Sequence, residues 1–353
     1  MKRTNILKMA LSLAATAIFL AASCEQEPYE YEYTLTTPAA YVLNSGTPGG
    51  NDADILYVDI FNNSLVPHFI YNASGTTIGS EPRDIWVYNN GLMIPTKGNN
   101  EIVITSLNGN LLTTFTKGRV PDYMAADTSY AYVGYTNGIV SRLNPAKGEI
   151  DAEVEVGGEP KQMVSRDGKL YVANSSENNI AVINTKTFTL EKKISTASNP
   201  HYMTCDSTGT IFFICLQSSE ADGTLNILDK HDNIETIKEI VNPYNFSVGA
   251  DNKIYCLCKD KNGFEVKRYD WKSDKAEGFI AEGETMSNNP TAIDVNPVTG
   301  QVFIVDNEGK DSYEPGQLYV YSTEGKLVKL CNTYGSNPCK TEFLIAYQAT
   351  IKQ

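Results

Sequence analysis

The chain has 353 residues, of which 10% are aromatic, and 42 acidic against 29 basic residues give it a formal net charge of −13. It has no block of Lys or Arg outside the extreme N-terminus, so nucleic acid and anionic lipid surfaces are poor partners for it. The length alone suggests two domains, but the repeat described below predicts one.

Residues 1–23 have the pattern of a signal peptide. Lys2, Arg3 and Lys8 form its basic start, and the apolar stretch that follows is too short to span a bilayer. The segment ends in Leu-Ala-Ala-Ser-Cys at residues 20–24. This motif resembles the bacterial lipoprotein box, which implies that Cys24 is lipidated. The alternative is an ordinary cleavage site that happens to precede a cysteine.

Residues 24–37 are predicted to form an acidic tether after the lipidated cysteine. The run Glu-Gln-Glu-Pro-Tyr-Glu-Tyr-Glu at residues 25–32 has no apolar core. An acidic run at this place resembles the signal that exports lipoproteins to the outer cell surface in some gut Gram-negative bacteria. We therefore expect an outer-membrane protein that is anchored by lipid only and faces the outside, the alternative being a flexible tether without such a signal.

Seven prolines then return at steps of 39 to 48 residues, each just ahead of an alternating apolar run: Pro82, Pro121, Pro160, Pro200, Pro243, Pro290 and Pro338. A period of about 40–45 residues is the length of one four-stranded propeller blade. In the clearest copy, strands are predicted at 161–165, 170–174, 180–184 and 189–194, with an Asp-Gly turn at 167–168.

The two ends of the chain complete each other. Ala40–Ser45 matches the second strand of the clearest copy, and 55–60 and 65–71 are predicted as third and fourth strands. After Pro338 a single strand remains near Phe343–Ala349. The predicted fold is therefore all-β: a seven-bladed β-propeller over residues 38–353, made of four-stranded blades, with its closing blade shared between the N- and C-termini.

Signals for an enzyme are sparse. The chain has no nucleophile elbow, P-loop, dinucleotide fingerprint or zinc-protease motif, and its three histidines are not spaced as a metal pair. We expect neither catalytic activity nor a metal site, and we expect His68 to lie in a strand of the closing blade. A disulfide between Cys331 and Cys339 is plausible in an oxidising compartment, although spacing cannot prove it.

Function is expected where the blades differ from one another. In a propeller, the residues after the prolines and at the ends of the second strands open on one face, which carries the mouth of the central channel. Their side chains suit a sizeable, largely uncharged polar ligand with flat faces. The alternative is that they are solvated loop ends. The predicted ligand contacts are Arg83, Tyr123, Tyr135, Lys161, Gln162, Asn174, His201, Tyr202, Tyr244 and Asn245.

The blade pattern Pro…Asp-Gly…Leu-Tyr-Val-Ala-Asn…Asn-Ile-Ala-Val-Ile-Asn resembles the YncE-type propellers. With the lipoprotein box and the acidic tether, the chain resembles the BtuG-type surface lipoproteins. That resemblance implies capture of cobalamin or a related corrinoid, as a transported ligand and not as a catalytic cofactor, and its transfer to a TonB-dependent outer-membrane transporter. It rests on architecture and not on matched ligand contacts. The alternative is a propeller that docks another protein or a glycan.

Overall fold

The structure is a computed structural model that describes residues 31–116, 118–144, 149–218, 222–261, 263–308 and 313–351. The predicted signal peptide and Cys24 lie outside the described residues. No helix among the described residues is both long enough and apolar enough to cross a membrane.

The chain divides into two compact units. One joins Met1–Thr34 with Tyr347–Gln353, and in its described part the Thr350 hydroxyl donates to the Glu32 carbonyl oxygen over 3.3 Å. The other unit, Leu35–Ala346, holds the repeat. Residues 31–37, predicted as the end of the tether, lie instead in the strand β1 (Tyr31–Asn44).

Within the described residues the strands form seven four-stranded sheets, numbered here in chain order, with their strands listed from one sheet edge to the other. The first contains β28 (Pro338–Ile351), β1 (Tyr31–Asn44), β2 (Asp54–Asp59) and β3 (Ser64–Val66). The second contains β4 (Trp86–Tyr88), β5 (Gly91–Thr96), β6 (Glu101–Ser106) and β7 (Leu111–Thr116). The third contains β8 (Pro121–Ala126), β9 (Ala131–Tyr135), β10 (Ile139–Asn144) and β11 (Glu149–Glu155).

The fourth sheet contains β12 (Pro160–Arg166), β13 (Lys169–Asn174), β14 (Asn179–Asn184) and β15 (Thr189–Ser195). The fifth contains β16 (Pro200–Cys205), β17 (Ile211–Cys215), β18 (Thr224–Leu228) and β19 (Ile234–Val241). The sixth contains β20 (Pro243–Val248), β21 (Ile254–Asp260), β22 (Gly263–Asp270) and β23 (Lys275–Gly278). The seventh contains β24 (Pro290–Val295), β25 (Val302–Asp306), β26 (Pro315–Tyr321) and β27 (Leu327–Ser336). The predicted all-β class and the seven four-stranded sheets are confirmed.

Six of the seven repeated prolines start a first strand, whereas Pro82 forms an isolated bridge with Thr96 and β4 begins only at Trp86. Pro160 pairs with Asn174 at the end of the second strand, and the register then shifts before Met163. In all seven sheets a residue at the end of the second strand, or directly after it, donates its N–H to the carbonyl of the residue before the proline, as from Ser175 to Glu159 over 3.1 Å. The predicted Asp-Gly turn has both residues at positive φ, 50° and 75°, as a type I′ hairpin requires.

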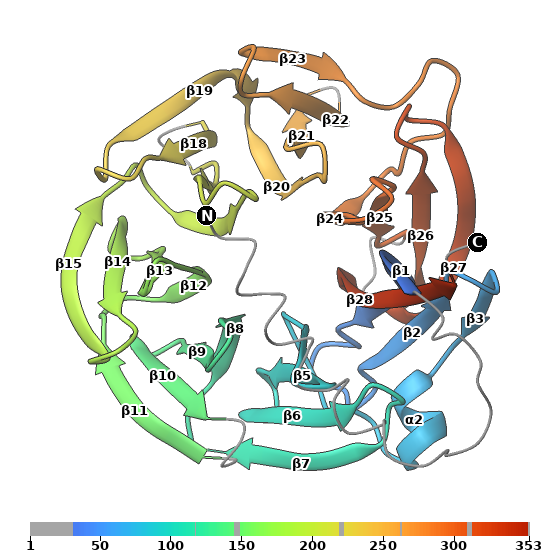
Figure 1. Cartoon of the computed structure of the whole chain (residues 1–353), viewed down its shortest axis with the longest axis horizontal. Coiled ribbons are helices and arrows are strands. Elements are labelled where there is room, and N and C mark those ends of the chain that lie inside the picture. Colours follow the sequence, from blue (N-terminus) through green and yellow to red (C-terminus); the bar gives the residue numbers. More distant parts are fainter. Residues whose placement is uncertain are drawn as a thin grey trace, which may run out of the picture. The chain divides into compact units, whose positions relative to one another are not determined.

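Clusters of buried side chains join each sheet of this unit to the next. Among the described residues there are seven such clusters. Tyr41 of the first sheet packs with Leu92 of the second, and Val42 of the first packs with Phe303 of the seventh. The clusters therefore follow a cyclic order that returns to its start. Figure 1 shows the first strands of the sheets on the inside of the unit and the fourth strands on its outside.

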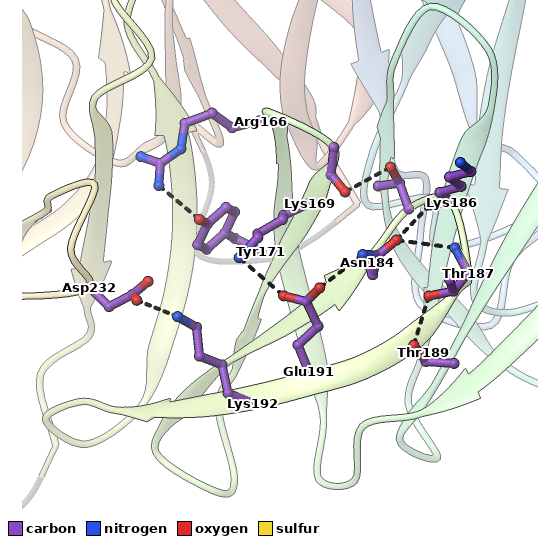
Figure 2. A network of polar contacts seen from close by, with 12 residues as sticks. Arg166, Lys169, Tyr171, Asn184, Lys186, Thr187, Thr189, Glu191, Lys192 and Asp232 are labelled. Atoms are coloured by element: carbon purple, nitrogen blue, oxygen red, sulfur yellow. Dashed lines mark hydrogen bonds and ion pairs between the residues drawn. The ribbon is translucent and has the colours of Figure 1, made fainter.

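The outer strands carry polar contacts that serve packing. Figure 2 shows such a network on the fourth sheet, where Glu191 of β15 binds Lys169 at 3.1 Å and accepts from the Asn184 amide at 2.9 Å. Lys192 pairs with Asp232, which lies between β18 and β19 of the fifth sheet. Of these contacts, the pair between Lys192 and Asp232 links neighbouring sheets, and the other two join strands within the fourth sheet.

The predicted fourth strand at 65–71 is wrong in its second half. β3 ends at Val66, and Phe69–Ser74 form the helix α2, so His68 lies at its N-cap with φ 51° and not in a strand. The carboxylate of Asp54 accepts the N–H of Ile70 over 3.0 Å and that of Tyr71 over 3.3 Å. These are the free donors of a helix start, and β2 supplies their acceptor.

The disulfide that the sequence left open is not formed, because Cys331 and Cys339 are free thiols. Cys331 lies on β27 and packs in the cluster between the seventh and first sheets. Cys339 lies at the start of β28 and packs in the cluster between the first and second. The two thiols therefore belong to different sides of the first sheet.

Candidate functional site

The residues that follow the seven prolines and end the second strands form a surface that we call the proline-loop face. It contains a cavity of about 290 Å³, the mouth cavity. All seven sheets contribute to its lining. Of the ten predicted ligand contacts, six line this cavity: Arg83, Tyr123, Gln162, Tyr202, Tyr244 and Asn245.

Aromatic side chains form one wall of the mouth cavity. Tyr123 meets the ring of Tyr202 edge-on at 6.3 Å, and His201 lies 4.7 Å from Tyr202. Burial raises the pKa of Tyr202 to about 12, so its hydroxyl is neutral. Tyr123 is only 7% exposed, whereas Tyr244 is 38% exposed at the rim. The wall therefore presents one accessible tyrosine above two that are held in place by packing.

Two of the predicted amide contacts also hold the fold together. Gln162 Oε1 accepts the backbone N–H of Met203 in the next sheet over 2.9 Å. Asn245 Oδ1 accepts that of Ile293 in the same way over 3.5 Å. Each amide side chain lies two residues after the proline of its own sheet. The N–H that it binds lies three residues after the proline of the next sheet. Their oxygens are thus committed to linking neighbouring sheets while the side chains line the cavity.

The other four predicted contacts lie outside the cavity lining. Asn174 is fully buried, and its amide donates to the Gly157 carbonyl over 2.7 Å and accepts the Glu159 N–H over 3.0 Å. Tyr135 is buried beneath the guanidinium of Arg119, and Lys161 forms an ion pair with Asp122 at 2.8 Å.

His201 is the fourth, and it packs edge-on against Tyr123 at 5.9 Å. Burial, assisted by the charge of Lys161, lowers the pKa of His201 to about 4, so the imidazole is neutral at physiological pH. The prediction that these four residues bind a ligand stays untested, but their contacts give each of them a packing or pairing role in this structure.

The structure reveals a charged cluster that the sequence prediction missed. Lys340 Nζ lies 2.6 Å from Asp84 Oδ1. Asp294 accepts the Thr341 N–H over 2.7 Å, and Glu342 accepts the Val87 N–H over 3.1 Å. Asp84, Asp294, Lys340 and Glu342 come from the innermost strands of three different sheets or the residues just before them.

Burial governs the charge of this cluster. It raises the pKa of Asp294 to about 6 and that of Glu342 to about 7, in spite of the nearby ammonium group of Lys340. Burial alone would lower the pKa of Lys340, but the carboxylates of Asp84 and Glu342 outweigh it and raise that pKa.

A sequence signal for the cluster existed. The fourth residue after each proline is Trp86, Ala125, Val164, Thr204, Ser247, Asp294 or Glu342. Only Asp294 and Glu342 are charged at this position. Their two carboxylates therefore distinguish the seventh and first sheets from the other five. No group of His, Cys, Asp and Glu in the described part of the chain is arranged to hold a metal ion.

The model of a protein family described as a domain of unknown function, DUF5074, matches residues 39–337. This chain belongs to that family. None of the curated proteins matches it.

Solved structures share the fold. A quinonprotein alcohol dehydrogenase-like protein from Bacteroides thetaiotaomicron has a TM-score of 0.66 at 14% identity, over 87% of this chain and 78% of that one. A protein from Lactobacillus plantarum has a TM-score of 0.64 at 17% identity, over 88% of this chain and 100% of that one. A putative 6-phosphogluconolactonase from Bacteroides fragilis has a TM-score of 0.64 at 11% identity, over 87% of this chain and 98% of that one. At these identities the likeness concerns the β-propeller-like fold alone.

Proposed function

We propose that this DUF5074 protein is a closed seven-bladed propeller that captures cobalamin or a related corrinoid at the proline-loop face. It then passes the corrinoid to a TonB-dependent outer-membrane transporter. In this proposal the lipid on Cys24 holds the protein at the outer membrane, exposed on the cell surface, and the protein performs no catalysis.

The observation that carries the proposal is the convergence of the predicted contacts. Six side chains from five sheets, chosen because they differ between repeats, line one cavity. Tyr244 and Arg83 are exposed at this cavity, and Arg83 takes part in none of the ion pairs formed among the described residues. An accessible ring, an available guanidinium and amides at one concave site suit a ligand with flat faces, amide groups and a phosphate.

The size of the cavity restricts how a corrinoid would sit. A corrin ring with its side chains is larger than 290 Å³, so the ring would lie across the face with one edge or its nucleotide tail inside. Tyr244 at the rim would then stack on the corrin, and Arg83 would meet the phosphate of the tail. Tyr123 and Tyr202, which are packed against each other, would form the floor.

Calorimetry of the chain without residues 1–28, titrated with cyanocobalamin, tests the proposal. We expect saturable heat and a 1:1 stoichiometry. An aromatic anchor in a binding site is worth about 2 kcal/mol or more on truncation, so Tyr244→Ala should weaken binding by about 30-fold.

Phe61→Ala is the matched control. Phe61 is exposed in the turn between β2 and β3, which opens on the opposite face from the proline loops, and its loss should leave the affinity unchanged. If the wild-type protein gives neither heat nor a spectral shift with micromolar cobalamin, corrinoid capture is refuted and docking of a protein or glycan takes its place.

A further inference from the structure

A second cavity, of about 330 Å³, lies beyond the mouth cavity along the same first strands. Its lining comes from positions further into those strands, two to seven residues after the prolines, whereas the mouth cavity takes mainly the earlier positions. The two cavities share part of their walls, including Asp294 and Lys340. We call the second one the channel cavity. No predicted function uses it.

The lining of the channel cavity mixes apolar and polar side chains. Trp86, Met163, Met203 and Phe343 contribute apolar surface, and Asp294 and Glu342 contribute carboxyl groups. Such a lining suits a ligand with an apolar body and a polar end.

The charges of the cluster are unbalanced. Three carboxyl groups (Asp84, Asp294 and Glu342) face a single ammonium, that of Lys340, which is already paired with Asp84 at 2.6 Å. Asp294 and Glu342 therefore have no cation of their own within the cluster. A buried carboxylate without a counter-ion is costly, and a bound cation would remove that cost.

A polar group with no partner lies in the same wall. Thr341, between Lys340 and Glu342 on β28, is 2% exposed and lines the channel cavity. Its hydroxyl oxygen makes no hydrogen bond in the described structure. Buried hydroxyl groups are normally satisfied, so an unpaired one in a cavity wall points to an absent donor or acceptor.

The lining of the channel cavity restricts the kind of cation that could bind there. The carboxyl groups are not arranged to hold one metal ion among the described residues, which disfavours a bare divalent cation. The indole of Trp86 already has the Lys340 ammonium 5.3 Å from its ring centroid, so this wall tolerates a cation over an aromatic face. A cation with an apolar body would meet both kinds of wall.

We propose that the channel cavity binds a small organic ammonium ion. Its apolar body lies against Trp86, Met163, Met203 and Phe343, and its N–H groups donate to Glu342 and Asp294. The proposal does not depend on corrinoid capture, although the two cavities share Gln162, Asp294 and Lys340.

Calorimetric titration of the full mature protein with 2-phenylethylamine tests this site, with 2-phenylethanol as the uncharged counterpart. We expect saturable binding of the amine and none of the alcohol. Binding of the cation favours the ionised carboxyl groups, so it should release protons and tighten as the pH rises from 5.5 to 8. The charged groups that face Glu342 are Lys340, Asp84 and Asp294, and the thiol of Cys205 also lines the cavity.

Glu342→Gln is the decisive variant, because its amide oxygen can still accept the Val87 N–H and so preserve the fold. Loss of a charged partner should weaken amine binding by about tenfold or more and reduce the proton release. Glu265→Gln, on the exposed part of β22, is the control and should bind as the wild type does. The proposal is overturned if the amine gives no saturable heat at millimolar concentration. Equal binding of the alcohol, or unchanged affinity in Glu342→Gln, would overturn it as well.

Discussion

The same position in successive repeats performs two different tasks. Two residues after the proline, Asp84, Gln162 and Asn245 accept a backbone N–H from the next sheet. At the corresponding place in the third and fifth sheets stand Tyr123 and Tyr202, whose rings form the wall of the mouth cavity. Residues that link the sheets thus alternate with tyrosines, and two of the linking residues, Gln162 and Asn245, line the cavity as well, so the site is built into the packing between blades.

His201 makes the stability of the protein sensitive to acid. Its pKa is about 4 in the folded protein, against an ordinary value of 6.5, so the unfolded chain binds more protons between these two pH values. This contribution therefore disfavours folding increasingly as the pH falls through that window, by at most about 3 kcal/mol. In His201→Asn the loss of stability between pH 7 and pH 4.5, measured by urea unfolding, should be about 2 kcal/mol smaller than in the wild type. Equal losses in both proteins would contradict this expectation.

Glu342 acts in the opposite direction. Its pKa is raised from 4.5 to about 7 in the folded protein, so the unfolded chain loses its proton first as the pH rises. At pH 4 the carboxyl group is protonated in both states and its charge has no effect on stability. The free-energy cost of ionising the buried group grows through the range from pH 4.5 to 7. Glu342→Gln should raise the free energy of unfolding at pH 8 by about 3 kcal/mol and leave it unchanged at pH 4. A variant that is stabilised equally at both pH values would show that the carboxyl charge is not the cause.

At the scale of elements, β28 is the strand on which the first sheet depends. It supplies the edge of the sheet next to β1, and its side chains Phe343 and Leu344 pack in the clusters on the two sides of that sheet. Without it, β1 would present an unpaired edge and both clusters would open.

Deletion of residues 341–353 should therefore lower the melting temperature sharply and broaden the transition, as measured by circular dichroism. Deletion of residues 347–353 alone is the control. Those residues lie outside the unit Leu35–Ala346, so their loss should leave the main transition in place. An unchanged melting curve after the longer deletion would show that β28 is dispensable.

The sequence was a good guide to elements that repeat and a poor one to elements that do not. The period of the prolines predicts the sheets because each proline pairs with the second strand of its sheet and the same hydrogen bond recurs at the end of every second strand. The helix α2 occurs once, is six residues long, and takes its N-terminal acceptor from Asp54, sixteen residues before Ile70. A helix that short has no period of its own to read.

The site follows the same rule. Six predicted contacts line the mouth cavity because variable positions beside an invariant proline must share one face. Asn174 lies outside the lining of this cavity, and nothing in the sequence shows that its amide binds the Gly157 carbonyl. The partners of Glu342 and Asp294 lie in other sheets, so their burial and their raised pKa values depend on packing that one strand does not reveal.

At the scale of the whole molecule, the proposed anchoring at the outer membrane rests on one residue. If the lipid on Cys24 is the anchor, Cys24→Ala should release the protein from the membrane fraction. Protease added to intact cells should digest the wild-type protein if it faces outward. Retention of the variant in washed outer membranes would contradict lipid anchoring, and protection of the wild type would contradict surface exposure.

The pairing of β28 with β1 also determines when folding of the first sheet can be completed. The Thr36 hydroxyl donates to the carbonyl of Ala346, which lies 310 residues later in the chain. Contacts over such a separation form late, because most of the chain between them must already be ordered to bring the ends together. Because synthesis starts at the N-terminus, the edge of β1 stays exposed until β28 has been made. Any early stop in translation would leave a protein that cannot protect this edge at all.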